Sequence, residues 1–119
     1  YVWSIRKQLY TMDMRAAISD IIGRYDFKAF EGVGSPRTHT TRHVMAADLV
    51  ESDNRLLTFR IEADGFLRFM VRNIVGTLVD VGLGKTSPVE FKQILKSRDR
   101  TKAGATAPAR GLCLVEVKY

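Results

Sequence analysis

The segment of residues 66–81 is the most apolar part of the chain, and it constrains the fold more than any other feature. Phe66, Met70, Ile74 and Leu78 recur every four positions with valines between them, which predicts an α-helix with a wide buried face. A helix that is apolar over so much of its surface must be covered on several sides. We therefore expect residues 66–81 to form the central helix of the core.

Two arginines stand in this predicted helix. Arg68 and Arg72 lie four residues apart, hence on one helix face, and Gly76 follows at the next step. One interpretation is that both are ordinary surface arginines on a helix that packs closely against a neighbour at Gly76. The other starts from the position of Arg72 in the middle of an otherwise buried helix, where a guanidinium needs a carboxylate or phosphate partner. Local sequence leaves both interpretations open.

The rest of the chain alternates predicted strands and helices. Strands are expected over residues 1–7, 43–50, 56–63 and 112–119, the middle two forming an antiparallel hairpin, and residues 31–41 are loop-like. Apolar spacing of three and four predicts a helix over residues 12–22, with Gly23 at its C-terminal end, and a Ser-Pro-Val-Glu capping box at 87–90 begins another helix that reaches Ser97. This order predicts an α+β fold: an antiparallel sheet with helices packed on one face, of ferredoxin-like and RRM-like type.

Length and composition limit the class of protein. With 119 residues, 45% of them hydrophobic, the chain can bury one modest core, so residues 1–119 are expected to form a single domain. The only cysteine, Cys113, cannot form an internal disulfide, and no Cys and His residues stand at the spacing of zinc ligands. No apolar run approaches the roughly 20 residues that cross a bilayer, which favours a soluble, cytoplasmic protein. Because the chain starts at Tyr1 rather than methionine, we expect it to be part of a longer protein.

The positive charge is concentrated in one part of the chain. The net charge is +6, and residues 68–110 carry nine basic and three acidic side chains, which accounts for the whole excess. This distribution indicates a surface that binds a polyanion, although a lysine-rich helix face that only aids solubility would have the same composition.

Catalytic motifs do not emerge from the residues alone. The two histidines, His39 and His43, lie where a loop enters a strand and favour a surface role, and no Ser, His and Asp arrangement points to a nucleophile. The Gly-Leu-Gly-Lys-Thr run at 82–86 lacks the spacing and preceding strand of a phosphate-binding loop. The residues by themselves therefore predict a basic α+β domain that binds an anionic polymer.

A resemblance to a known family indicates a specific function, which the residue patterns alone do not. The run Asp-Gly-Phe-Leu-Arg-Phe-Met-Val-Arg-Asn-Ile-Val-Gly at residues 64–76 resembles a signature of the bacterial-type tRNA pseudouridine synthase A family. Further blocks are similar to the family and occur in the family's order. They are Asp-Phe at 26–27 with Ala-Phe at 29–30, Asp-Arg-Thr at 99–101, Ala-Thr-Ala-Pro-Ala at 105–109, and Gly-Leu-Cys-Leu-Val-Glu-Val-Lys-Tyr at 111–119.

The resemblance implies an isomerase that converts uridines in the anticodon stem-loop of tRNAs to pseudouridine, without metal or cofactor and usually as a homodimer. It also implies two related α/β halves with the active site between them. The family's catalytic aspartate stands in a Gly-Arg-Thr-Asp-Ala-Gly motif that these 119 residues do not contain. The chain therefore resembles the C-terminal half alone, which we expect to be inactive by itself.

Two site residues follow from the resemblance. Arg72 matches the arginine that pairs with the catalytic aspartate, and Leu112 matches the apolar residue that packs against the target base or its aspartate. Apart from these two matched positions, we expect contacts with the RNA backbone from Arg37, Arg42, Arg68, Asn73 and Lys102. The alternative is a catalytically idle RNA-binding or dimerisation module, in which a carboxylate of this same chain would satisfy Arg72.

Overall fold

The computed structural model describes residues 2–6, 11–32, 39–51, 56–67, 69–104 and 113–116. Along the chain these form strand β1 (Val2–Arg6), helix α1 (Thr11–Ser19), strand β2 (Gly23–Asp26), the 3₁₀ helix η1 (Lys28–Phe30), strands β3 (Thr41–Glu51) and β4 (Leu56–Ala63), helices α2 (Met70–Gly82) and α3 (Pro88–Ser97), the 3₁₀ helix η2 (Arg100–Lys102) and strand β5 (Cys113–Glu116). Among the helices of this described part, none has the length and apolarity needed to cross a membrane.

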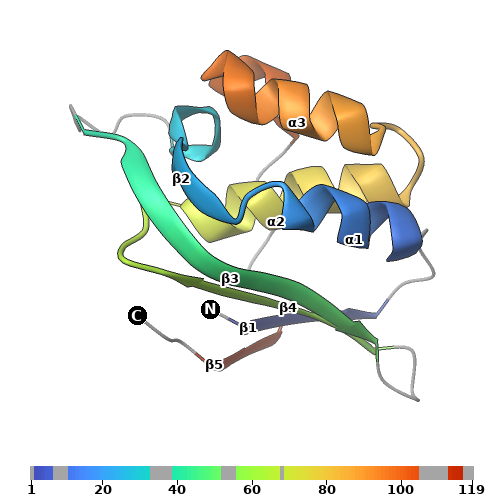
Figure 1. Ribbon diagram of the computed structural model, residues 1–119. Coiled ribbons are helices and arrows are strands. Elements are labelled where there is room, and N and C mark those ends of the chain that lie inside the picture. Colours follow the sequence, from blue (N-terminus) through green and yellow to red (C-terminus); the bar gives the residue numbers. More distant parts are fainter. Residues whose placement is uncertain are drawn as a thin grey trace.

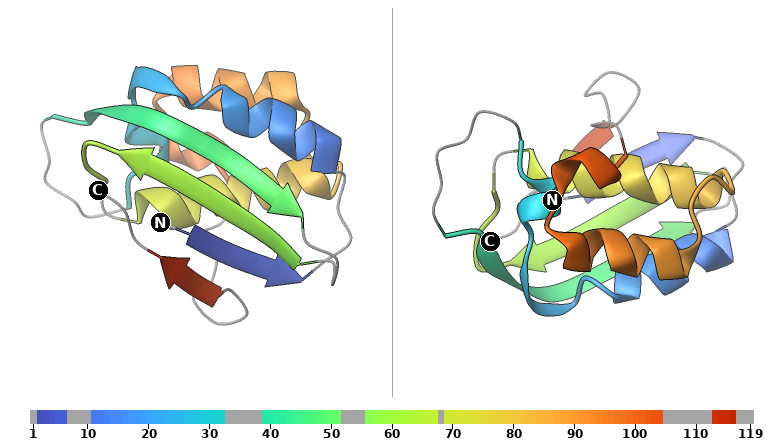
Figure 2. Two further views of the ribbon diagram at one scale, coloured as in Figure 1. Left: turned by 60° about the horizontal axis from the view of Figure 1, so that its bottom comes forward. Right: turned by 90° about the horizontal axis from the view of Figure 1, so that it is seen from above.

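The strands form one antiparallel sheet in the order β2-β3-β4-β1-β5. Helices α1 and α2 lie over one face of the sheet, and α3 lies farther out, over both of them (Figures 1 and 2). The predicted α+β architecture, with helices on one face of an antiparallel sheet, is confirmed. The predicted hairpin is confirmed as well, because β3 pairs with β4 along its length.

The core lies between the sheet and the helices. On β4, Phe59, Ile61 and Ala63 are buried, whereas the residues between them are only partly buried. This alternation places every second side chain of the strand against the helices. The predicted central helix supplies the opposite side of the core, with Ile74 and Leu78 of α2 fully buried.

Helix α2 begins later than its sequence pattern predicts. The periodicity starts at Phe66, but Phe69 adopts a left-handed backbone (φ 57°) and the helix begins at Met70. A residue at positive φ cannot continue a right-handed helix, so the helix starts only after Phe69. Arg72 therefore stands in the first turn of α2 rather than in its middle, and the prediction that Arg68 shares its helix face falls on a residue outside the described ones.

Strand β2 is absent from the sequence prediction. The expected helix over residues 12–22 ends at Ser19, and Gly23, at φ 128°, is the first residue of β2 rather than a helix cap. The four residues of β2 show no alternation of apolar and polar types, and they are extended because they pair with residues 41–44 of β3. Pairing with a neighbour, not local propensity, makes this segment a strand.

The start of α3 follows its sequence signature. The Ser87 hydroxyl accepts a hydrogen bond from the Glu90 amide at 3.1 Å, and the Glu90 carboxylate accepts one from the Ser87 amide at 3.0 Å. This reciprocal pair satisfies two amides that the helix itself leaves without partners, so the predicted capping box is confirmed.

Removing this cap should weaken the fold measurably. Ser87→Ala is expected to lower the free energy of unfolding by about 1 kcal/mol, because the Glu90 amide loses its acceptor. Ser87→Asp keeps an acceptor at the same place and should stay close to the unsubstituted protein. Urea denaturation followed by circular dichroism measures both, and equal losses in the two variants would contradict the assigned role.

Candidate functional site

The site is built at the N-terminal end of α2. The buried Leu67 anchors the approach to the helix, and its carbonyl accepts a hydrogen bond from the Met70 amide at 3.0 Å. Phe69, the N-cap residue, makes no side-chain capping bond, and its carbonyl accepts from the Asn73 amide at 2.9 Å. The helix therefore starts abruptly after a tight turn, and its first turn presents Arg72.

Arg72 is half-buried, between the buried residues Val71 and Asn73. Its guanidinium carbon lies 5.1 Å from the centroid of the Phe69 ring. This distance falls within the range of about 6 Å at which a cation is attracted to the face of an aromatic ring. The structure thus places the predicted site arginine at the start of a rigid helix, against an aromatic side chain.

Asn73 points into the protein. It is fully buried; its side-chain amide donates to the Phe30 carbonyl at 2.7 Å, and its side-chain oxygen accepts from the Arg100 guanidinium at 3.2 Å. A direct contact with an RNA backbone would require this side chain to leave both partners. In this conformation Asn73 joins segments of the fold, which differs from the surface contact expected for it.

Arg100 and Thr77 extend this network to the segment that follows η2. The Arg100 guanidinium donates to the Gly104 carbonyl at 3.0 Å, and the Gly104 amide donates to the Thr77 hydroxyl at 2.9 Å. That hydroxyl in turn donates to the Asn73 carbonyl at 2.9 Å. The backbone at Gly104 is therefore held directly against α2.

Three sequence blocks that carry the family resemblance meet in this network. Phe30 belongs to the block at 26–30, Asn73 to the signature at 64–76, and Arg100 to the block at 99–101. Hydrogen bonds from Asn73 to the Phe30 carbonyl and from Arg100 to Asn73 connect them through side-chain atoms of the middle residue. The blocks are far apart in sequence but form one structural unit beside Arg72.

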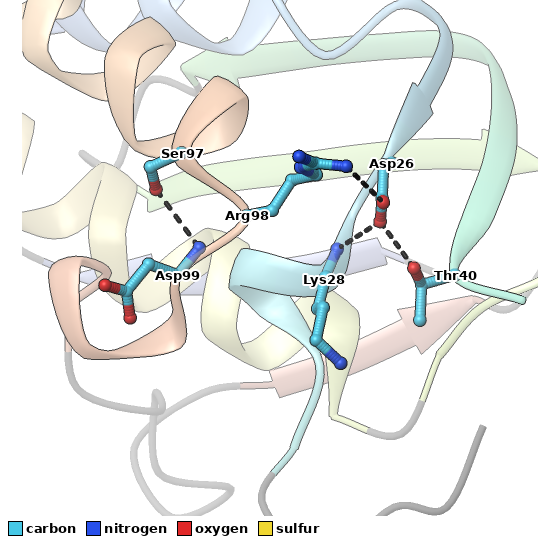
Figure 3. A network of polar contacts seen from close by, with 6 residues as sticks. All are labelled: Asp26, Lys28, Thr40, Ser97, Arg98 and Asp99. Atoms are coloured by element: carbon cyan, nitrogen blue, oxygen red, sulfur yellow. Dashed lines mark hydrogen bonds and ion pairs between the residues drawn. The ribbon is translucent and has the colours of Figure 1, made fainter. Parts of the chain in front are cut away.

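A second network, drawn in Figure 3, ties β2 and η1 to the end of α3. The Asp26 carboxylate accepts from the Lys28 amide at 3.0 Å and from the Thr40 hydroxyl, and its other oxygen lies 4.0 Å from the Arg98 guanidinium. Arg98 also has a left-handed backbone (φ 56°), where α3 ends. Because the side chain of Arg98 is 66% exposed, this ion pair is screened by solvent and orients the groups more than it stabilises them.

Asp99 organises the start of η2. Its carboxylate accepts from the Thr101 hydroxyl at 2.6 Å and from the Thr101 amide at 3.0 Å. These bonds favour the charged carboxylate and hold the pKa of Asp99 below its usual range. The charged Asp99 thus fixes the turn that carries Arg100 and Lys102.

Of the remaining predicted site residues, the structure describes some and leaves the others outside the described ranges. Arg42 is half-buried and donates to the carbonyls of His39 at 3.1 Å and Thr41 at 2.7 Å, whereas Lys102 is exposed on η2. Arg37, Arg68 and Leu112 lie outside the described residues.

Gly104 is required by the close approach of its backbone to α2, where Gly76 already predicts a close neighbour. A Cβ added at Gly104 would lie 2.5 Å from an Asp80 carboxylate oxygen, 3.1 Å from the Thr77 Cα and 3.3 Å from the Gly76 carbonyl oxygen. The carboxylate can rotate away, but the α2 backbone cannot. The neighbour that passes Gly76 is therefore the chain at Gly104.

Gly104→Ala is expected to destabilise the protein by about 1–3 kcal/mol, the usual cost of overpacking a tight contact. Gly65→Ala is the matched control, because among the described residues its Cβ would meet only the Arg42 side chain, at 3.5 and 3.7 Å, which is ordinary contact. Thermal unfolding of both variants tests the difference. If Gly104→Ala melts at the same temperature as Gly65→Ala, the close approach is not as tight as described.

Sequence reasoning did not single out Arg100, Thr77 or Phe69. Arg100 lies within the Asp-Arg-Thr block, so its place in the resemblance was a usable signal. Thr77 and Phe69 look like ordinary helix residues in sequence. Their roles depend on the tertiary contact with Gly104 and on the left-handed turn before α2.

The described fold is an antiparallel α+β domain in which an arginine stands at the start of a central helix. Comparison with known proteins adds the family. The family model described as tRNA pseudouridine synthase matches residues 17–119. A tRNA pseudouridine synthase A from Thermoanaerobacter sp. is 49% identical over 120 residues, covering 100% of this chain and 48% of that protein.

Other relatives agree. The tRNA pseudouridine synthases A of Clostridium acetobutylicum and Moorella thermoacetica are each 44% identical over 119 residues, covering 100% of this chain and 48% of each relative. The chain belongs to the tRNA pseudouridine synthase family. It spans about half the length of the curated relatives it matches.

Proposed function

We propose that this chain is the C-terminal half of a tRNA pseudouridine synthase A and forms one wall of its active site. The observation that supports this most directly is the position of Arg72, half-buried at the start of α2 and adjacent to a network that joins three family blocks. A guanidinium held there can pair with a carboxylate from outside these 119 residues. The proposed partner is the catalytic aspartate of an N-terminal half.

The proposed reaction is an isomerisation. The bond between uridine N1 and ribose C1′ breaks, the base rotates, and a bond forms between C5 and C1′; C5 loses its proton and N1 gains one, so atoms and charge balance. The target base must first leave its stack to be reached. In this proposal Arg72 orients the aspartate, Leu112 packs against the base, and no metal or cofactor takes part.

The proposed substrate is the anticodon stem-loop of tRNA. The excess of basic residues between 68 and 110 supports a polyanionic partner, because cationic side chains attract nucleic acid regardless of its sequence. We assign backbone contacts to Arg37, Arg42, Arg68 and Lys102, and we assign Asn73 to holding the site instead. The complete enzyme is proposed to be a cytoplasmic homodimer.

Pseudouridine formation on a tRNA transcript labelled in its uridines tests this function. The chain is assayed alone, then mixed with an N-terminal half made from the same gene, and then mixed with that half carrying an asparagine in place of its motif aspartate. Activity only in the mixture with the intact aspartate supports the proposal. Activity of the chain alone would refute the assignment of the chemistry to the other half.

An idle binding module is the second candidate, since these 119 residues lack the family's aspartate motif. It would bind tRNA or dimerise yet remain inactive in every mixture. Measuring tRNA binding by the same preparations separates this outcome from a failure of the two halves to assemble.

A further inference from the structure

Phe69 has an unusual backbone for its residue type. Its φ of 57° lies in the left-handed region, where bulky side chains are rarely found because the Cβ crowds the backbone. Such strain persists only where surrounding structure enforces it, and it often marks a functional position. The residue is 42% exposed and its side chain makes no capping bond, so neither full burial in the core nor helix capping accounts for a phenylalanine there.

The Phe69 ring does have a defined contact. The guanidinium carbon of Arg72, three residues later, lies 5.1 Å from the ring centroid. The ring stands on the left-handed residue just before α2, and Arg72 stands in the first turn of the helix. The tight turn and the helix thus bring an aromatic face and a cation together within a short, rigid stretch of chain.

We propose that Phe69 is a positioning residue for Arg72: its ring holds the guanidinium by a cation–π contact and sets the direction in which the arginine meets its carboxylate partner. This inference rests on the proposed function, since the carboxylate belongs to the proposed active site. A guanidinium must present its planar fork correctly to bind a carboxylate through two hydrogen bonds. Resting the guanidinium on the ring reduces the number of orientations that it samples.

Because the backbone of Phe69 is strained, a single substitution there should change stability and activity in opposite directions. Asparagine tolerates the left-handed region better than phenylalanine but has no aromatic face. Phe69→Asn is therefore expected to shift the melting temperature upward while lowering activity. A side chain that only supports the fold would not raise stability and lower activity in the same variant.

The activity test uses the enzyme reconstituted from this chain and its N-terminal half. Phe69→Leu removes the ring but keeps an apolar side chain at the same strained position, and it should lower kcat about tenfold with KM little changed, as expected for a cation–π contact of ordinary strength. Phe69→Tyr keeps the ring and should retain nearly full kcat. Replacing Phe69 by phenylalanines with increasing ring fluorination, which withdraws charge from the ring face, should lower kcat stepwise.

A second readout does not depend on catalysis. In the same preparations, NMR signals of the Arg72 side chain should carry a ring-current shift that Phe69→Leu abolishes and Phe69→Tyr retains. If the unsubstituted enzyme forms no pseudouridine although its halves assemble, the proposed function fails. If it is active but Phe69→Leu and the fluorinated variants keep full kcat, or if the ring-current shift is absent, the positioning role of Phe69 is overturned.

Discussion

Arg72→Met is expected to reduce pseudouridine formation by the reconstituted enzyme about a thousandfold while the protein stays folded. Breaking a buried charge pair by removing one partner typically costs about 3–5 kcal/mol, and each 1.4 kcal/mol corresponds to a factor of ten. Methionine keeps an unbranched apolar stem like that of arginine, so packing at the start of α2 is largely preserved. The loss should therefore fall on kcat rather than on stability.

Two further variants sharpen this expectation. Arg72→Lys keeps the charge but not the planar fork, so its activity should lie between that of the unsubstituted enzyme and that of Arg72→Met. Arg24→Met makes the same chemical change at an exposed position of β2 and should leave activity unchanged. Single-turnover assays with circular dichroism of each variant separate chemistry from folding, and an Arg72→Met enzyme within a few-fold of full activity would contradict the assigned role.

Asn73→Ala is expected to lower the free energy of unfolding by about 2–4 kcal/mol. The substitution removes the buried donor to the Phe30 carbonyl and the acceptor of the Arg100 guanidinium at once, and a buried group left without its partner costs about 1–3 kcal/mol. It also leaves a small cavity beneath the first turns of α2. The segment carrying Gly104, which Arg100 holds, should loosen in the same variant.

Asn73→Asp and Gln93→Ala are the matched comparisons. Asn73→Asp preserves the shape and the acceptor for Arg100 but, when ionised, sets a buried carboxylate oxygen against the Phe30 carbonyl oxygen, so it should also destabilise the protein. Gln93→Ala removes an exposed amide from α3 and should be nearly neutral. Urea denaturation measures all three, and an Asn73→Ala midpoint equal to that of Gln93→Ala would show that the network contributes no stability.

Local sequence was sufficient to predict the structure wherever a few neighbouring residues determine it. The capping box at Ser87 and Glu90 needs only four consecutive residues, and its two hydrogen bonds are present. The alternation over residues 56–63 likewise placed Phe59 and Ile61 on the buried face of β4. In the same way, the apolar period of residues 66–81 identified the helix that faces the core, although not its first residue.

The residues of the candidate site were not predictable from local sequence alone. Resemblance to a family selected Arg72, but the network adjacent to it joins distant segments: Asn73 and Phe30, which are hydrogen-bonded, are 43 positions apart in sequence. No periodicity encodes such a contact, because each partner looks locally like an ordinary loop or helix residue. Asn73, for which a contact with the RNA backbone was expected, lies in the interior.

Local sequence was enough to predict the fold class, the hairpin, the core-facing helix and the cap of α3, because periodicity and capping act over neighbouring residues. Residues 23–26 form a strand only through tertiary contacts, since they are extended by pairing with β3. The interior position of Asn73 likewise depends on tertiary contacts, because its bonds to Phe30 and Arg100 exist only once distant segments have packed together.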